Sequence, residues 1–294
     1  MKVVKIGRHS IELSNMHKII FPQDKITKGE IVDYYYRIAK VMVPHMKGHL
    51  ISMQRFPNGI DKEGFYQKEA GSYFPSWIPL KAVKKEESSE LVHYVVCNNT
   101  ATLVYLANQL CLTPHLWLSK SDKLHYPDRM IFDLDPSGKE FSYVIDAAKI
   151  LKDVLEAHKL VPFVMTTGSR GLHVVVPLKR TKKFDYVRSF ARHIASEMAK
   201  DDPKRFTVEV RKEKRNGRVF IDYLRNGFGA TGVAPYAIRP KKGAPVAAPL
   251  EWDQVKKGLS SQQYNIKNIF KRISQHGDPW KHINKHAKTL KKID

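Results

Sequence analysis

Apolar residues recur along this chain with two spacings, and each spacing predicts a different kind of element. Short apolar or alternating runs bounded by turn residues predict strands. We expect a strand pair over residues 1–14 and strands over 50–56, 64–68, 91–96, 161–167, 174–178, 206–210 and 219–224. Apolar residues three and four apart predict helices from residue 27, over 100–110, along 144–155 and over 184–200. The last forty residues are rich in lysine and are also expected to be helical.

The first long helix has a sequence signal for its beginning. Thr27 and Glu30 have the spacing of a capping box, in which each side chain binds the backbone N–H of the other residue. Upstream, Ser14 or Asn15 is expected to cap a short helix over residues 16–20, which Pro22 ends.

Three lysines flank the break between these two expected helices. Lys18, Lys25 and Lys28 could bind a phosphate. Solvated surface lysines would look the same in a sequence, and the residues alone favour that plainer interpretation.

One apolar stretch, residues 130–136, ends in two carboxylates. In a strand, Asp133 and Asp135 would project from one face while Phe132 and Leu134 point into a core, and Pro136 would end the strand. Neighbouring carboxylates repel each other unless a cation joins them, and hard oxygen ligands suit Mg²⁺ or Mn²⁺. A strand that runs into an Asp/Pro turn without a metal remains the alternative.

A third carboxylate occurs in an apolar strand about ninety residues later. Asp222 lies among Phe220, Ile221 and Tyr223, where a charge is costly unless it is paired or bound to a metal. A two-metal phosphoryl-transfer site needs such a residue beside the first pair. A salt bridge to Arg225 or Arg218 is the structural alternative, and the residues alone leave both open.

A glycine-containing loop joins two expected strands at residues 167–173. Gly168 and Gly171 would let backbone N–H groups approach an anion, and Ser169, Arg170 and His173 add donors suited to a triphosphate. The alternative is a plain hairpin turn with a glycine at positive φ. The combined polar set favours phosphate binding.

Two further features are weaker. Arg55, Phe65 and Lys68 interleave cations with an aromatic ring, a combination that binds bases by stacking and phosphates by charge. Core aromatics beside surface charges would look the same. His115 is as consistent with a buried core histidine as with a ligand contact.

Composition narrows the class of partner. The 294 residues include 51 Lys and Arg against 29 Asp and Glu, a net charge of +22, which makes nucleic acid the expected partner. No apolar run has the length of a membrane span, and no signal-type segment opens the chain, so we expect a cytoplasmic, nucleoid-associated protein without a membrane partner. Cys97 and Cys111 are expected to be reduced, buried thiols.

Taken together, the motifs resemble a known family. Asp133-Leu134-Asp135-Pro136, Gly168-Ser169-Arg170-Gly171-Leu172-His173 and Phe220-Ile221-Asp222-Tyr223 resemble, in order and spacing, the three motifs of the archaeo-eukaryotic primase superfamily. More closely, the chain resembles the polymerase domain of bacterial ligase D, from the segment around Lys18 to Ala234–Arg239 and Gly243–Val246. The resemblance therefore covers nearly the whole chain.

The resemblance implies an α+β primase-polymerase fold. Its catalytic core would be a mixed or antiparallel, RRM-like sheet flanked by helices, with an N-terminal α/β lobe. Residues 1–294 would form one domain, with the N-terminal lobe over about 1–120 and the catalytic lobe and C-terminal helices over about 121–294.

The resemblance also implies roles for particular residues. Asp133 and Asp135 would bind two divalent cations, Mn²⁺ or Mg²⁺, and Asp222 would complete the site for the cation that activates the primer 3′ hydroxyl. Lys18 and Lys28 would bind a 5′ phosphate on the downstream strand.

The incoming nucleotide would have its own group of contacts. Ser169 and His173 would bind its triphosphate, with Arg239 and either Lys68 or Arg55 as helpers. Phe65, or its neighbour Tyr66, would stack near the templating base, and His115 would lie near the nucleotide.

By this resemblance the chain is expected to be an enzyme that fills gaps and extends 3′ ends during non-homologous end joining, with a preference for ribonucleotides. Its substrates would be DNA ends or gapped DNA with a 5′ phosphate, and NTPs or dNTPs. The sequence contains no Lys-x-Asp-Gly adenylation motif, so a separate DNA ligase and a Ku-like end-binding protein are the expected partners. A de novo primase of the same superfamily and a non-catalytic nucleic-acid-binding module are the alternatives.

Overall fold

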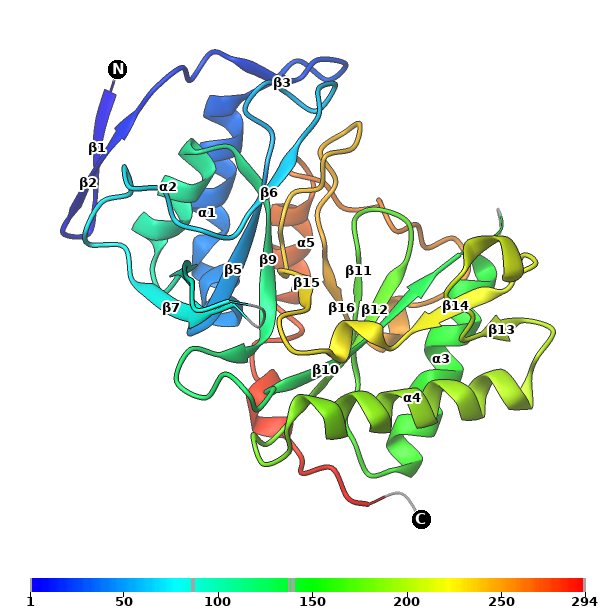
Figure 1. Cartoon of the computed structure of the whole chain (residues 1–294). Helices are drawn as coiled ribbons and strands as arrows, with labels where there is room; N and C mark the ends of the chain where they lie inside the picture. The colour runs from blue at the N-terminus through cyan, green and yellow to red at the C-terminus, as the bar shows by residue number, and fades with distance from the viewer. Residues whose placement is uncertain (1, 86–87, 137, 139–140, 293–294) are drawn as a thin grey trace.

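Two sheets with helices on their outer faces form the framework of the protein (Figure 1). The computed structural model describes residues 2–85, 88–136, 138 and 141–292. In this part of the chain, no helix combines the length and the apolar character that crossing a membrane requires.

The first sheet has the strand order β15-β9-β5-β8-β7, with β6 paired to β5. Its strands are β5 (His49–Arg55), β6 (Phe65–Gln67), β7 (Leu80–Lys84), β8 (Leu91–Val96), β9 (Cys111–Lys120) and β15 (Thr231–Val233). One face packs on the helices α1 (Lys28–Met46) and α2 (Thr100–Asn108) and buries Ile51, Met53 and Leu116 in a shared core. Because side chains alternate along a strand, the residues between these point to the opposite face, which looks toward the second sheet.

The second sheet has the order β13-β14-β10-β12-β11-β16. Its strands are β10 (Arg129–Asp135), β11 (Phe163–Thr166), β12 (Leu172–Pro177), β13 (Phe206–Thr207), β14 (Val219–Asp222) and β16 (Pro249–Leu250). Only the β13–β14 pair is parallel among the described pairs, so the sheet is mixed. Helices α3 (Ser142–Ala157) and α4 (Phe184–Asp201) cover one face around Phe132, Leu134 and Val174. The predicted α+β class with a mixed sheet core is confirmed.

Shorter elements complete the described chain. They are the hairpin β1 (Lys2–Ile6) and β2 (His9–Leu13), the pair β3 (Ile19–Phe21) and β4 (Ile26–Thr27), helix α5 (Ile269–His276), and the 3₁₀ helices η1 (Lys212–Lys214), η2 (Leu224–Asn226), η3 (Trp252–Gln254) and η4 (Ile283–His286). The helical tail predicted for the last forty residues is therefore realised only by α5 and η4, because turns occupy the rest of its described part.

The region before α1 differs from the sequence prediction in one element. The capping box is present: Thr27 N donates to Glu30 Oε2 at 2.8 Å and Glu30 N donates to Thr27 Oγ1 at 3.3 Å. The short helix expected over residues 16–20 is wrong, because Ile19 instead pairs with Thr27 across the β3–β4 ladder. A helix of five residues ahead of Pro22 would form too few hydrogen bonds to compete with that pairing.

Helix α1 also fixes a distant segment of the chain. Tyr34 Oη donates to the carbonyl oxygen of Tyr236 at 2.7 Å, and Ile238 N donates to Tyr35 Oη at 3.0 Å. Residues 234, 236–238, 244 and 246–248 accordingly belong to the core of the first sheet. The division of the chain near residue 120 stays a prediction, and this packing joins the two halves closely.

We expect Tyr34→Phe to lower the free energy of unfolding by about 1–2 kcal/mol, because the substitution leaves a buried carbonyl oxygen without its hydroxyl donor. Tyr36→Phe, two residues along α1, is the matched control, since Tyr36 is 54% exposed. It should change stability by less than about 0.5 kcal/mol. Urea unfolding followed by circular dichroism measures both, and equal stabilities for the two variants would contradict the assignment.

Candidate active site

Strand pairing brings the predicted carboxylates together. Asp133 on β10 lies opposite Asp222 on β14 and, on its other side, opposite His173 on β12. Residues that oppose each other in a ladder point to the same face of the sheet. Phe132 and Leu134 are fully buried under the helices on the other face, as predicted. The functional face is thus the one turned toward the first sheet.

Asp133 is buried between two nitrogen-bearing side chains. Arg225 Nε donates to Asp133 Oδ2 at 2.7 Å, and His173 Nε2 lies 3.4 Å from Oδ1. Burial raises the pKa of Asp133, but attraction from His173 and Arg225 outweighs burial, and the pKa lies well below its usual range. Asp133 therefore carries its negative charge at neutral pH.

Asp135 and Asp222 have the opposite shift. Burial raises the pKa of each carboxyl, and the nearby charge of Asp133 raises it further. Arg170 Nη2 lies 3.5 Å from Asp135 Oδ2, and Leu224 N donates to Asp222 Oδ1 at 2.7 Å. These contacts offset the repulsion only in part.

The salt bridge considered for Asp222 forms elsewhere. Arg225 binds Asp133, and Arg218 donates to the backbone carbonyls of Arg215 and Lys214 at 2.8 and 2.9 Å. No basic side chain in the described residues forms an ion pair with Asp222. Asp222 is therefore not paired directly with a basic side chain among the described residues.

A divalent cation fits this cluster by its donor type. Asp133 Oδ1 is buried and accepts no hydrogen bond of ordinary geometry from the described residues, and an orphaned carboxylate oxygen beside two more carboxylates suits a hard cation. Arg225 covers the other oxygen of Asp133. Consistent with that, the described residues contain no group of three His, Cys, Asp or Glu side chains already arranged around a metal position. The cluster has ligands of the right type, and Arg225 occupies one of the two oxygens of Asp133.

The glycine loop between β11 and β12 is shaped by its two glycines. Gly168 has a φ of +63°, and a Cβ on Gly171 would overlap the carbonyl oxygen of Leu134 on β10. Thr167 Oγ1 accepts hydrogen bonds from the backbone N–H groups of Ser169 and Gly171 at 3.3 and 3.2 Å. The loop is therefore a hairpin turn that also packs tightly against the carboxylate strand.

A cavity of about 330 Å³ lies between the two sheets. Residues of both sheets and of the adjoining loops line the cavity. They are Tyr66, His115, Asp133, Asp135, Thr167, Ser169, Arg170, His173, Arg225, Thr231, Val233 and Arg239. The structure thus gathers the predicted residues Asp133, Asp135, Ser169, His173, His115 and Arg239 around one hollow. Asp222 does not line this hollow but lies opposite Asp133 in the β10–β14 ladder.

Several buried nitrogens in the cavity wall have no partner. His115 Nε2, His173 Nδ1 and Arg239 Nε make no hydrogen bond to the described residues, although Arg239 Nη1 donates to Thr167 O at 3.0 Å. Burial, together with the positive charges of Arg239 and Arg225, lowers the pKa of His115 to about 3, so this imidazole is neutral at physiological pH. Unsatisfied buried polar atoms of this kind indicate a polar ligand.

Three predicted nucleotide contacts do not line the cavity. Arg55 Nε donates to Gln109 O at 2.8 Å, and the Phe65 ring lies beside the Arg55 guanidinium at 5.6 Å. Lys68 lines a neighbouring hollow. Successive residues of β6 point to opposite faces, so Tyr66, the alternative to Phe65, does line the cavity. The centroids of the Tyr66 and His115 rings are 5.4 Å apart, in an edge-on arrangement.

Lys18 and Lys28 are neighbours across a turn. Lys28 N donates to Lys18 O at 2.8 Å, and Lys28 is 4% exposed, with Ser14 Oγ 3.5 Å from its Nζ. Burial and the charge of Lys18 lower the pKa of Lys28 to about 8. Lys28 is therefore no ordinary surface lysine.

Thr231 and Val233 are cavity residues that sequence reasoning missed. They lie on β15, which pairs with β9 so that Val233 opposes His115 and Thr231 opposes Trp117. No local pattern marks them, because their place depends on a pairing between segments more than a hundred residues apart.

The geometry agrees with comparisons to known proteins. A family model described as "LigD, primase-polymerase domain" matches residues 27–280. The chain belongs to the LigD primase-polymerase domain family. Members of this family are DNA-directed nucleotidyltransferases, and this chain is one of them.

Relatives in the family are longer proteins. The multifunctional non-homologous end joining protein LigD of Mycolicibacterium smegmatis is 30% identical over 271 residues, which covers 91% of this chain and 35% of the relative. The bifunctional LigD of Bacillus subtilis is 28% identical over 284 residues, covering 94% of this chain and 45% of the relative. The chain therefore spans less than half the length of these relatives.

A solved structure has the same fold. The polymerase domain from Mycobacterium tuberculosis ligase D, in complex with DNA, matches with a TM-score of 0.88 and 27% identity over 94% of this chain and 99% of that chain. Polymerases of this kind use divalent cations, which agrees with the donor type of the carboxylate cluster.

We expect Arg225→Gln to raise the affinity of the protein for Mn²⁺ about tenfold in the absence of nucleotide. The substitution frees Asp133 Oδ2 from a charge-assisted hydrogen bond that a cation must otherwise displace. Arg218→Gln removes the same charge but no contact to Asp133, so it should change the affinity less. Isothermal titration calorimetry with Mn²⁺ compares the variants, and equal affinities would refute the competition.

Proposed function

We propose that this protein is a template-directed polymerase that fills gaps and extends 3′ ends during non-homologous end joining. The observation that carries the proposal is the cluster of Asp133, Asp135 and Asp222. Asp133 and Asp135 line one wall of a cavity together with the glycine loop, and buried nitrogens without a hydrogen-bond partner among the described residues lie in the same cavity. The names of the relatives, which are end-joining proteins, support the biological setting.

The cavity walls suit the two ends of a nucleotide triphosphate. On the second-sheet side, Ser169, Arg170 and His173 offer hydroxyl, guanidinium and imidazole donors beside the carboxylates. On the first-sheet side, the Tyr66 ring and the neutral His115 offer an aromatic wall for a base or a sugar. We propose that the triphosphate lies along the glycine loop and the nucleoside against Tyr66 and His115.

Arg239, which also lines the cavity, would bind the phosphates. Its guanidinium is largely buried, and its Nη1 is held by the carbonyl oxygen of Thr167, so it needs little reorganisation to meet an anion. The tyrosines of α1 hold the backbone just before it, at residues 236–238.

Asp133, Asp135 and Asp222 would hold two divalent cations, Mn²⁺ or Mg²⁺. When bound, such cations polarise the attacked phosphate, favour ionisation of the attacking hydroxyl and neutralise the departing pyrophosphate. The chain itself contributes the rigid placement of the carboxylates on paired strands.

Lys18 and Lys28 would bind the 5′ phosphate of the downstream strand. Lys28 is largely buried, and among the described residues its Nζ forms a single long hydrogen bond, to Ser14 Oγ at 3.5 Å, so its charge suits an anion. This feature favours end joining over the alternative of a de novo primase, which needs no downstream phosphate. Gap filling on a 5′-phosphorylated gapped duplex, compared with the unphosphorylated gap, separates the two functions.

Partners and conditions follow from the same proposal. The substrates would be DNA ends or gapped DNA with NTPs or dNTPs, and a Ku-like protein and a separate DNA ligase would act with it in the cytoplasm, at the nucleoid. A preference for ribonucleotides and for manganese is part of the proposal. The gap-filling assay with each NTP and dNTP, in Mg²⁺ and in Mn²⁺, measures both preferences.

We expect Asp222→Asn to reduce nucleotide incorporation by at least about a hundredfold, because the cluster loses a charged cation ligand. DNA binding should change less than twofold, since it depends mainly on lysine and arginine. Primer extension and fluorescence anisotropy measure the two quantities on one preparation. Loss of both together would instead indicate a structural role for Asp222.

We expect the affinity gained from a 5′ phosphate to fall by up to about tenfold between pH 7 and pH 9. The phosphate is already fully charged above pH 7, whereas Lys28, with a pKa of about 8, loses its positive charge over this interval, so the attraction is present below pH 8 and lost above it. Anisotropy titrations with phosphorylated and unphosphorylated gapped DNA give the ratio at each pH.

Two variants control the pH experiment. Lys28→Ala should show a small phosphate effect that does not vary with pH, whereas Lys25→Ala, at an exposed lysine of the same loop, should behave like the unchanged protein. A pH-dependent phosphate effect that persists in Lys28→Ala would contradict the role of Lys28.

A further inference from the structure

The face of the first sheet that closes the cavity continues beyond it. His115 and Trp117 are two apart on β9 and share this face, as do Thr231 and Val233, which lie opposite them. The same face extends across β8 to Val83 on β7, at the far edge of the sheet. The sheet face beside the cavity therefore extends from β15 to β7.

Two hollows follow this surface away from the cavity, with volumes of about 380 and 640 Å³. They share Val83, Lys84, Lys85 and Phe228, so they lie next to each other. Trp117 and Gly229 line the inner hollow, next to the cavity residue Thr231, and Lys183 and His125 line the outer one. We call the two hollows together the sheet groove.

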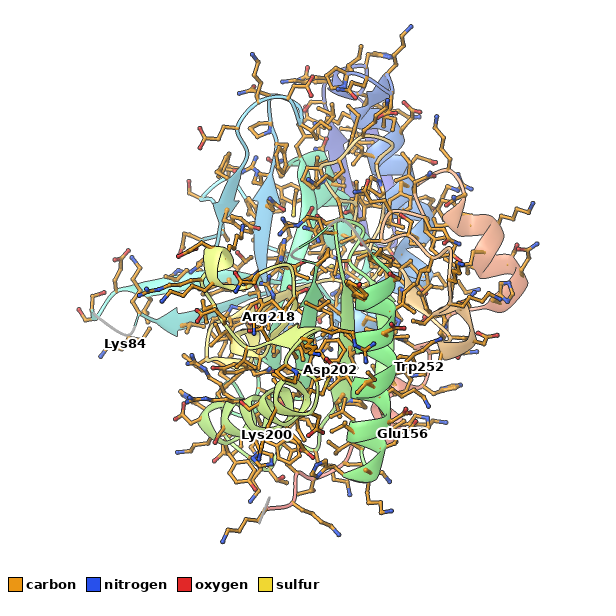
Figure 2. The ribbon with its side chains drawn as sticks, turned by 90° about the vertical axis from the view of Figure 1, so that its right-hand side faces the viewer. Lys84, Glu156, Lys200, Asp202, Arg218 and Trp252 are labelled. Carbon is orange, nitrogen blue, oxygen red and sulfur yellow. The ribbon has the colours of Figure 1, made fainter. Side chains whose placement is uncertain are left out.

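The sheet groove is strongly basic. Its described lining residues include a single acid, Asp185, against Lys68, Lys81, Lys84, Lys85 and Lys183. Lys85 is paired with Glu90 at 2.7 Å, but Lys84 and Lys183 are exposed and form no ion pair with any described residue. Figure 2 shows Lys84 on the arm of the β7–β8 hairpin that projects well away from Lys200 and Glu156.

The sheet groove also contains aromatic rings. The His125 ring lies flat on Phe228, with centroids 4.7 Å apart and planes 7° from parallel, and Phe228 contacts Trp117 at 5.2 Å. His125 is exposed to solvent. Half-buried Val83 and Val92 complete an apolar floor.

We propose that the sheet groove binds a single-stranded stretch of nucleic acid, the template as it leaves the catalytic cavity. Lysines on the rim with a stackable ring and an apolar floor between them match the phosphates and bases of a single strand. Thr231 of the cavity lies opposite Trp117 of the groove in the β15–β9 ladder, and this proximity favours the template over an unrelated ligand. This inference rests on the proposed polymerase function.

The test uses the whole chain with two double variants of equal charge. Lys84→Ala with Lys183→Ala removes two unpaired lysines of the groove. Lys149→Ala with Lys200→Ala is the control, at exposed positions of α3 and α4. Lys183 and Lys200 lie at opposite ends of α4, about 25 Å apart at 1.5 Å per residue.

Fluorescence anisotropy with labelled dT₁₂ at increasing salt measures the slope of log affinity against log salt concentration. The groove variant should lower the magnitude of this slope by about 1.4, which corresponds to two phosphate contacts on a single strand. The control variant should retain the slope of the unchanged protein. His125→Ala should weaken binding to dT₁₂ but not to an abasic strand of the same length.

Equal slopes for the two double variants would overturn the sheet groove, because binding would then depend on net charge alone. An equal effect of His125→Ala on dT₁₂ and on the abasic strand would overturn its stacking role. Primer extension by the unchanged protein and by Asp133→Ala is measured in parallel. Extension that requires Asp133 while the slopes stay equal leaves the polymerase function standing without the groove, whereas extension that persists in Asp133→Ala removes the function itself.

Discussion

Repulsion among three carboxylates is the physical constraint around which this protein is built. Asp133, Asp135 and Asp222 are brought together by strand pairing, and each would resist burial without positive charge nearby. Arg225 and His173 keep Asp133 ionised, although its Oδ1 has no hydrogen bond of ordinary geometry from the described residues, while Asp135 and Asp222 have raised pKa values. A site in which one carboxylate has basic neighbours and two others repel it is suited to a further cation.

The scaffold holds this arrangement by placing a separate core behind each sheet. Phe132 and Leu134 anchor the carboxylate strand in the helix-covered core of the second sheet, so Asp133 cannot turn away from the cavity. Helices α1 and α2 support the first sheet from its far side. The cavity lies between two braced walls, which suits chemistry that depends on position and electrostatics rather than on a reactive side chain.

Contacts between distant segments complete the site. The hydroxyls of Tyr34 and Tyr35 fix the backbone at residues 236–238, immediately before Arg239, and β15 adds Thr231 and Val233 to the edge of the first sheet. The same edge strand leads from the cavity to the groove around Trp117 and Phe228. The nucleotide-sized cavity and the proposed path of the template thus share one wall.

The sequence by itself determined the local elements and most of the chemistry of the site. Alternation along β10 was enough to place Asp133 outward and Phe132 inward, and the Thr27–Glu30 spacing was enough to begin α1, because both depend only on near neighbours. Tertiary structure decided the rest: which of Phe65 and Tyr66 faces the cavity, that Arg225 binds Asp133 instead of Asp222, and that residues 19–21 form a strand instead of a helix. Each of these outcomes depends on the partner that a distant or neighbouring strand supplies, and no local pattern contains that information.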